Sequence, residues 1–207
     1  EWNHNQNAVL VPNEHYTGDR KAQNDGLNFV FYADASAAYA DLLSGNLDVL
    51  ESIPSSALAN FETDLGERAV NEPAAIFQSI TIPEGDKNFH GEAGALRRQA
   101  LSMAIDREEI TETIFQGTNT PAVDFTSPVV NDGATDIPGH EVLDYNPEKA
   151  RELWAKAEKM QPFEGPFTVA YNSDGSHNEW VDAVVNFIRN TLDIDAQPAP
   201  YPDFKSL

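Results

Sequence analysis

The sequence contains no cysteine among its 207 residues. Disulfide bridges, thiolate nucleophiles and metal or iron–sulfur sites built on cysteine are therefore excluded. It also has no apolar run close to the roughly 20 residues that a membrane-spanning helix needs, and no basic-then-apolar leader at its start. Because the chain begins at Glu1 rather than Met, we expect it to be a piece of a longer protein.

Positive charge is scarce. The 13 Lys and Arg residues face 34 Asp and Glu residues, which gives a formal net charge of −21. Such a surface repels phosphate backbones and anionic headgroups, so a nucleic-acid binder or a membrane-surface domain with basic patches is disfavoured. We expect cationic, zwitterionic or neutral partners, with the acidic surface either steering them or serving solubility. The 41% hydrophobic content is typical of a folded globular chain.

Motifs for common catalytic chemistry are also absent. The sequence has no nucleophile elbow, phosphate-binding loop, dinucleotide-binding glycine motif or EF-hand loop. The histidines are too dispersed for a metal motif: His4, His15, His90, His140 and His177. We therefore predict no catalytic residue, no metal and no cofactor. With 34 carboxylates some pair can reach glycosidase spacing by chance, so a carboxylate-based hydrolase stays as an alternative.

The first part of the chain alternates strand and helix patterns. An apolar patch at 8–11 predicts an edge strand, and the aromatic and β-branched run at 27–32 predicts a better one. Helical spacing over 36–43, followed by Gly45, predicts a short helix. Period-two spacing at 47–53 and the run at 74–82 predict two further strands.

The second part is richer in helices. Two abutting helices are predicted over 93–115, the second opened by a capping box of Asp106 and Glu109. Residues 118–145 lack periodicity and predict a long ordered loop, which is usually functional. Asn146 and Pro147 predict the start of the next helix.

The chain then returns to a strand at 167–171. A second capping box, Ser176 with Glu179, predicts a helix that runs to Leu192, and a last strand is predicted at 194–199. Strands separated by helices along the whole chain predict an α/β fold with a mixed sheet flanked by helices.

The run from Leu96 to Arg107, LRRQALSMAIDR, is followed by Glu109, Ile110 and Gly117. Four further motifs accompany it in a fixed order: PNEHY at 12–16, LSGNLD at 43–48, YNPEKARELW at 145–154, and YNS at 171–173 with the helix and strand after it. Together the five motifs resemble those of the family 5 extracellular solute-binding proteins, the dipeptide- and oligopeptide-binding class of ABC importers, and the run from Leu96 is the most specific of them.

Two segments depart from the family pattern. Residues 81–89 replace a stretch that usually carries an asparagine, and Asp193 precedes Ile194 where the family has glycine. The resemblance implies one lobe of a two-lobed periplasmic-binding-protein-like fold. We therefore predict that residues 1–207 form a single lobe, the second one.

The resemblance also implies the function and its partners. The intact protein is expected to hold a peptide or similar solute between two lobes and to deliver it to ABC permease subunits. It is expected outside the cytoplasm, in the periplasm or on the extracellular face of the membrane, attached only through a lipid anchor outside this fragment. The first lobe of the same protein is the other expected partner. Alternatives are the hydrolase, or a signalling or chaperone-like relative without a transport role.

Topology suggests where a ligand would bind, because ligands in open α/β sheets gather beyond the carboxyl ends of strands. We predict ligand-binding side chains at two strand ends and in the long loop: Gln78, Thr81, Phe125, Ser127, Tyr171, Asn172 and Asp174. Trp154 and Trp180 are expected to pack in the core. Arg97 and Arg98 are expected in exposed or structural ion pairs. Asp106 and Arg107 are expected to provide a cap and a fold-holding ion pair rather than ligand contacts.

Overall fold

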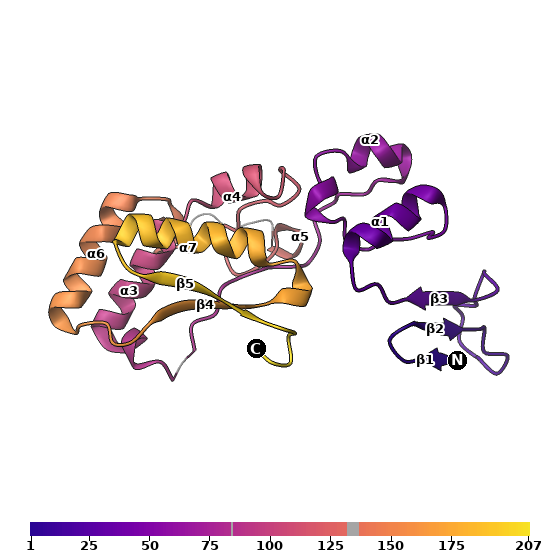
Figure 1. Ribbon diagram of the computed structural model, residues 1–207, viewed down its shortest axis with the longest axis horizontal. Helices are drawn as coiled ribbons and strands as arrows, with labels where there is room; N and C mark the ends of the chain where they lie inside the picture. Colours follow the sequence, from indigo (N-terminus) through magenta and orange to yellow (C-terminus); the bar gives the residue numbers. More distant parts are fainter. Residues whose placement is uncertain (84, 132–136) are drawn as a thin grey trace. The chain divides into compact units, whose positions relative to one another are not determined.

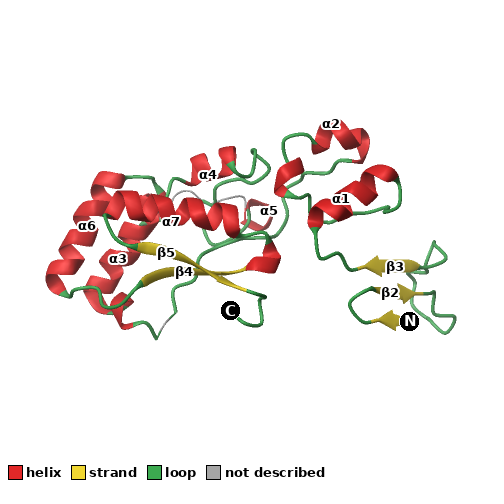
Figure 2. Cartoon of the chain, viewed as in Figure 1, coloured by secondary structure: helices red, strands yellow, loops and turns green. Residues whose placement is uncertain are grey.

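The computed structural model describes residues 1–83, 85–131 and 137–207. The chain divides into two compact units, which we call the N-terminal unit, Glu1–Ser56, and the C-terminal unit, Ala57–Leu207. Their elements are labelled in Figure 1 and coloured by type in Figure 2. In the part of the chain that is described, no helix combines the length and apolar character needed to cross a bilayer.

The N-terminal unit holds a small antiparallel sheet with strand order β1-β2-β3. The strands are β1 (Trp2–Asn3), β2 (Asn7–Leu10) and β3 (Leu27–Val30). The register pairs Asn7 with Val30 and Leu10 with Leu27. The strands predicted at 8–11 and 27–32 are therefore confirmed, within one to two residues at their ends.

Helix α1 (Ala35–Ser44) follows β3 and is capped by Asp34 at its N-terminus and by Gly45 at its C-terminus. The carboxylate of Asp34 accepts the backbone N–H groups of Ser36 at 2.7 Å and Ala37 at 3.2 Å. Gly45 ends the helix with a φ of +80°, a left-handed conformation in which glycine carries no Cβ penalty. The predicted helix at 36–43 is confirmed.

Two predicted strands are wrong. At the start of 47–53 the backbone forms hydrogen bonds to the end of α1 and not to another strand. The N–H groups of Asn46 and Leu47 both donate to Asp41 O, at 2.9 and 3.1 Å. The segment 74–82 is extended and almost wholly exposed, but no described strand pairs with it. Strand propensity needs a partner strand to become a sheet, and neither segment has one among the described residues.

The C-terminal unit contains the longer helices and a parallel strand pair. The helices are α2 (Phe61–Leu65), α3 (Gly91–Ala104), α4 (Arg107–Thr113), α5 (Pro128–Asn131), α6 (Pro147–Met160) and α7 (Asn178–Leu192). The strands are β4 (Phe167–Asn172) and β5 (Ala196–Tyr201). Short 3₁₀ turns include η2 (Gly66–Arg68), η3 (Lys87–Phe89), η4 (His140–Leu143) and η5 (Ser173–Gly175). A further one, η1 (Ser55–Ala57), crosses the boundary between the two units.

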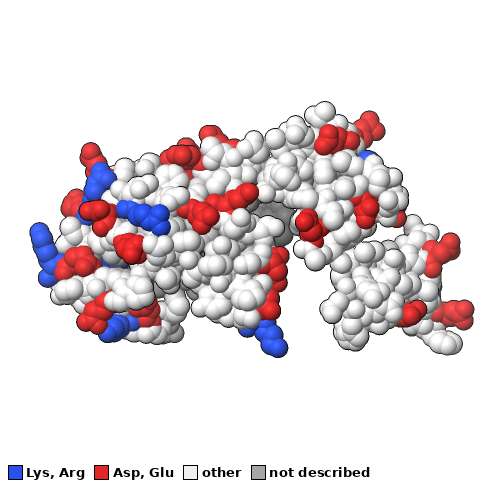
Figure 3. All heavy atoms as spheres, viewed as in Figure 1, with Lys and Arg blue, Asp and Glu red and all other residues white. Residues whose placement is uncertain are grey.

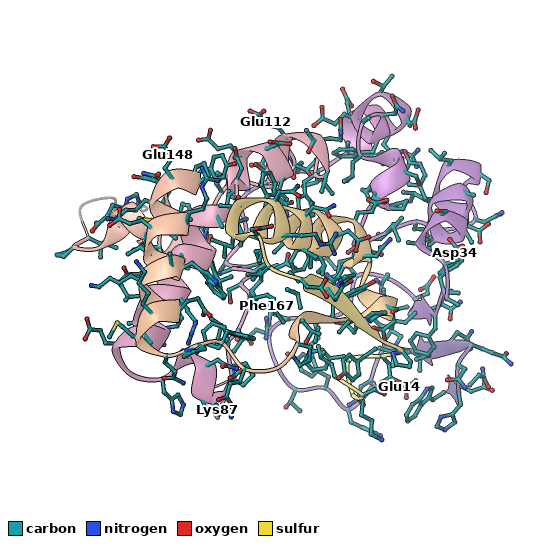
Figure 4. The ribbon with its side chains drawn as sticks, turned by 60° about the vertical axis from the view of Figure 1, so that its left-hand side comes forward. Glu14, Asp34, Lys87, Glu112, Glu148 and Phe167 are labelled. Atoms are coloured by element: carbon teal, nitrogen blue, oxygen red, sulfur yellow. The ribbon has the colours of Figure 1, made fainter. Side chains whose placement is uncertain are left out.

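Strand β4, helix α7 and strand β5 form a β-α-β unit whose apolar side meets α3 and α6. Helix α7 buries Val181, Val184, Val185 and Ile188 within one core that also holds Trp154 and Val169. Trp180 packs against the edge of this core, so both tryptophans lie where they are expected. Figure 4 shows Phe167 inside the unit, whereas Glu148 at the start of α6 points outward.

Of the three side-chain caps predicted at helix starts, two are confirmed. The side chain of Asp106 accepts Glu109 N–H at 3.0 Å, and that of Asn146 accepts Lys149 N–H at 3.0 Å, with Pro147 in the first helical turn. The capping box at Ser176 is wrong. Ser176 has a left-handed φ of +55°, and α7 begins two residues later without a side-chain cap.

The α/β class is confirmed, although the strands form two small sheets rather than one. The segment 118–145, predicted as a long loop, contains α5 and η4, and its residues 132–136 lie outside the described ranges. Assignment of residues 1–207 to a single lobe stays a prediction.

Candidate functional site

The turn after β4 brings three of the predicted site residues together. Tyr171 and Asn172 are the last residues of β4, and Asp174 lies in the 3₁₀ turn that follows. Asn172 Nδ2 donates to Asp174 Oδ1 at 2.6 Å. Because β4 and β5 are parallel, with Asn172 opposite Tyr201, this turn lies at the carboxyl ends of both strands. That is the edge where open α/β sheets bind ligands.

Two side chains lie close to the glycine of this turn. A Cβ atom at Gly175 would lie 2.4 Å from His177 Nε2 and 2.6 Å from Asn172 Nδ2, so only glycine fits without moving them. Trp180 Nε1 donates to His177 Nδ1 at 3.1 Å, and the two rings meet edge to face at 5.6 Å. Sequence reasoning missed Gly175 and His177, because the Ser176 capping box assigned a different role to this segment.

Two more predicted residues, Phe125 and Ser127, contact a segment that is distant in sequence, residues 74–77. The hydroxyl of Ser127, a buried residue, donates to Ala74 O at 2.6 Å. The rings of Phe77 and Phe125 meet edge to face at 6.3 Å. Phe125 is otherwise 89% exposed, which is unusual for an aromatic side chain with a purely structural role. Phe77 was not among the predicted site residues.

Gln78 and Thr81 lie on the exposed segment after Phe77 and not at the end of a strand. The structure thus brings Tyr171, Asn172 and Asp174 together. Gln78 is the neighbour in sequence of Phe77, whose ring contacts Phe125. Within the described ranges, no hydrogen bond or ring contact joins these two groups. Among the same residues, no set of three His, Asp or Glu side chains is arranged to hold a metal ion.

The electrostatic surroundings of the β4 turn are acidic. Beyond the end of β5, Asp203 accepts the hydroxyl of Ser206 at 2.6 Å and its backbone N–H at 2.8 Å. These hydrogen bonds, the hydroxyl's first, hold the pKa of Asp203 below its usual value. Asp174 lies two residues after the end of β4, and Asp203 lies two residues after the end of β5, so both carboxylates are at the same edge of the strand pair. On the face shown in Figure 3, acidic side chains are widespread and most basic ones gather towards α6.

The arginines of the strongest sequence motif hold the fold rather than a ligand. Arg97 is fully buried and forms the structural ion pair that was one of the two expected outcomes: it donates to Glu158 Oε1 at 2.7 Å, and also to Asn88 O at 2.7 Å. Arg107 donates to Ser102 O at 3.0 Å and Leu143 O at 3.1 Å rather than to a carboxylate, which corrects the expected ion pair. Burial lowers the pKa of Arg107.

A family comparison covers almost the whole chain. Residues 1–206 match the model of the bacterial extracellular solute-binding proteins, family 5 Middle. Among curated proteins, the periplasmic murein peptide-binding protein MppA of Escherichia coli is 27% identical over 205 residues, 93% of this chain. Heme-binding protein A of Haemophilus influenzae is 28% identical over 82% of the chain, and the dipeptide-binding protein DppE of Bacillus subtilis is 22% identical over 96%.

Solved structures agree on the fold. The Escherichia coli murein tripeptide binding protein MppA matches with a TM-score of 0.73 and 27% identity over 99% of this chain. The oligopeptide-binding protein AppA of Bacillus subtilis, solved with a nonapeptide, matches with a TM-score of 0.76 and 23% identity. The chain spans 36%, 30% and 36% of the three curated relatives and about 40% of the two structures.

Proposed function

The chain belongs to the bacterial extracellular solute-binding proteins of family 5, and from this membership we propose that the intact protein captures a peptide and delivers it to the permease of an ABC importer. The single observation that carries the proposal is the match over residues 1–206. Family membership by itself names no ligand, because related proteins are named for different solutes.

A peptide is the ligand that the relatives favour. MppA, DppE and AppA are named for murein peptide, dipeptide and oligopeptide binding. One observation supports a second candidate: heme-binding protein A is as similar to this chain as MppA is, with 28% against 27% identity. The described residues include no group of three metal-binding side chains.

The ligand is proposed to meet this chain at the two residue groups described above. A peptide presents a charged ammonium group and a row of backbone donors and acceptors. Asp174 and Asn172 offer a carboxylate and an amide for those groups, and the exposed ring of Phe125 offers an apolar surface for a side chain. Gln78, Thr81, Ser127 and Tyr171 complete the proposed set.

Binding is proposed to need more than these residues. One wall of a cleft leaves a ligand open to water, whereas closure of a second wall removes water and strengthens each polar contact. The other wall is proposed to come from the first lobe of the same protein. Closure is a population shift, which requires the ligand to bind the closed form more tightly than the open one.

The location follows from the same membership. We place the intact protein outside the cytoplasm, in the periplasm or on the outer side of the cell membrane. Attachment through a lipid anchor outside these residues is part of the proposal. A role in binding rather than catalysis is also proposed, and it is supported by a family that is described as solute-binding.

The test uses the intact protein and a ligand panel in a thermal-shift assay, followed by calorimetry. The panel contains di-, tri- and oligopeptides, haemin and a nickel–histidine complex. We expect peptides to raise the melting temperature in a concentration-dependent way. Stabilisation by haemin alone would favour haem over a peptide as the ligand. Turnover of a peptide, or of a glycoside in a separate assay, would support the hydrolase alternative.

Two variants test whether the peptide binds at the turn after β4. Asp174→Asn is expected to weaken peptide binding by about tenfold, because a charged hydrogen-bond acceptor is lost. Asp182→Asn is the matched control, since Asp182 is an exposed carboxylate on α7. Equal affinities for the two variants would remove Asp174 from the proposed site.

A further inference from the structure

The imidazole of His177 lies between the turn after β4 and the core of the C-terminal unit. Its Nδ1 accepts a hydrogen bond from Trp180 Nε1 at 3.1 Å, and Trp180 packs against the buried core. On the side of the turn, a Cβ atom at Gly175 would lie 2.4 Å from His177 Nε2 and 2.6 Å from Asn172 Nδ2. The imidazole and the Asn172 amide therefore share the space beside this glycine, and His177 connects the core to the proposed ligand site.

The start of α7 lacks the usual side-chain support. No side-chain cap is present at its N-terminus, and Ser176, just before it, has a left-handed φ of +55°. This conformation is unfavourable for a residue with a Cβ atom, so it persists only where neighbouring contacts enforce it. Among the described residues, the bond between Trp180 and His177 is the side-chain hydrogen bond that joins the turn to the helix.

This hydrogen bond requires an uncharged imidazole. An indole N–H is a donor only, and a protonated imidazole carries a proton on both nitrogens, so a protonated Nδ1 cannot accept the bond. Two donors would then face each other. A positive charge at the N-terminus of α7, a helix of 15 residues, is also disfavoured by the helix dipole. Protonation of His177 therefore breaks its contact with Trp180.

The other titratable groups near the turn come from the elements that meet there. They are Tyr171 in β4, Asp174 in η5, Glu179 in the first turn of α7, Tyr201 in β5 and Asp203 beyond it. In the part of the chain that is described, none of them has a hydrogen bond or ion pair with the imidazole. Between pH 5 and pH 7 tyrosine is ordinarily neutral and carboxylates are ordinarily ionised, whereas histidine changes its charge.

We propose that His177 is a positioning residue that makes ligand binding at the turn after β4 dependent on pH. With a neutral imidazole, the bond to Trp180 holds the turn, and Asn172 keeps its 2.6 Å hydrogen bond to Asp174 at the end of the strand. Protonation releases the turn, so that ligand affinity falls in acid. The inference rests on the proposed function, because it assigns regulation to that same site.

Nuclear magnetic resonance of the intact, ligand-free protein tests the switch without a ligand. Tryptophan indoles are labelled with nitrogen-15, and the resonance that is absent from Trp180→Phe is assigned to Trp180. Between pH 7 and pH 5 we expect this resonance to move in the unmodified protein. In His177→Asn it should stay in place, because the amide oxygen accepts the indole N–H but does not titrate. A resonance that ignores pH in the unmodified protein, or that moves equally in both proteins, would overturn the proposal.

Calorimetry of the intact protein tests the effect on binding. The probes are alanine peptides of two to five residues, which have no titratable side chain. From pH 7 to pH 5 we expect the dissociation constant to rise about three- to tenfold, as loss of one hydrogen bond predicts. His177→Asn should show no such rise. The matched control is His15→Gln, which replaces an exposed histidine of the N-terminal unit and should behave like the unmodified protein.

Two results of the calorimetry would overturn the proposal. One is a dissociation constant that does not change with pH in the unmodified protein, and the other is an equal rise in His177→Asn, which would assign the pH dependence to another group. No peptide binding at either pH would overturn the proposed function, and this regulation with it, even if the indole resonance responds to pH. The two experiments together therefore separate failure of the switch from failure of the proposed function.

Discussion

Nη2 of the fully buried Arg97 lies 2.7 Å from Oε1 of Glu158, and this ion pair joins three elements of the C-terminal unit. Arg97 comes from the middle of α3, and Glu158 from the last turn of α6. The same carboxylate accepts the backbone N–H of Phe163 at 3.0 Å, four residues before β4 begins. The guanidinium also lies 5.8 Å from the ring centre of Trp154. One buried charge thus connects two helices to the start of the strand.

Loss of this carboxylate should strongly destabilise the C-terminal unit. Glu158→Ala leaves the buried guanidinium without a counter-charge. Fully buried pairs lose about 3–5 kcal/mol in this way, and we expect a loss at or below the lower end of that range because the Glu158 side chain is 35% exposed. Chemical denaturation followed by tryptophan fluorescence measures the change. The control is Glu152→Ala on the same helix, which removes an exposed pair with Lys149 and should cost at most about 0.5 kcal/mol. Equal losses would mean that Arg97 needs no charged partner.

The start of α6 depends on a side-chain cap. Asn146→Ala removes the acceptor for Lys149 N–H and should lower the free energy of unfolding by about 1 kcal/mol. Asn146→Ser keeps a capping oxygen and should cost only a few tenths of a kcal/mol. Denaturation midpoints of the two variants provide the measurement. A serine variant as unstable as the alanine variant would show that the cap is not the cause.

Tyr32 provides a pH-dependent signal in the N-terminal unit. Its hydroxyl donates to Asp41 Oδ2 at 2.7 Å, and this hydrogen bond is the main reason that the pKa of Tyr32 lies above its ordinary value of 10.0. A raised pKa means that the stabilising contribution is complete below pH 10.0 and is lost as the pH rises through the raised value.

Ultraviolet titration of tyrosinate measures this pKa. We expect Tyr32→Phe to remove one ionisation that lies above the ordinary value of 10.0, and Asp41→Asn to return the pKa of Tyr32 towards that value. If Asp41→Asn leaves the titration curve unchanged, the hydrogen bond does not control this ionisation.

A side chain at the glycine of the turn after β4 should disturb the predicted site. In Gly175→Ala the new Cβ would displace His177 and Asn172, whose atoms lie 2.4 and 2.6 Å from its position. We expect peptide affinity of the intact protein to fall by a few-fold, up to about tenfold, because the Asn172 amide moves away from its present position beside Asp174. Gly85→Ala enters open space and is the control. A retained affinity in Gly175→Ala would place the ligand elsewhere.

The acidic surface should affect the rate of ligand capture. At about 0.15 M salt charges are screened beyond about 8 Å, so steering acts near the binding site. Lys-rich peptides should associate with the intact protein faster than Glu-rich ones at low salt, and the difference should shrink as salt is added. Stopped-flow association rates test this. Equal, salt-independent rates would assign the acidic surface to solubility alone.

Local signals predicted local structure well. The caps at Asp106 and Asn146 and the end of α1 at Gly45 were correct because each depends on residues within one helical turn. The strand predictions at 47–53 and 74–82 failed because a strand depends on a partner that may be far away in the sequence. For the same reason, the burial of Arg97 was not predicted: its partners Glu158 and Gln161 lie more than 60 residues away.

The site was predictable only where one short segment forms it. Tyr171, Asn172 and Asp174 share a strand end and its turn, and a topological rule identified them. The contact of Phe125 with Phe77 joins residues 48 positions apart, and no periodic pattern signals it. Gly175 could have been identified from its position between a strand and a helix, since tight βα turns favour glycine.

The central claim is that this chain supplies only part of a peptide-binding cleft. Isothermal titration calorimetry of one peptide set against the intact protein and against residues 1–207 alone tests it most directly. The account predicts dissociation constants of about 1 μM or tighter for the intact protein, and weak or undetectable binding by the isolated chain. Nanomolar binding by the isolated chain, or no peptide binding by the intact protein, would contradict it.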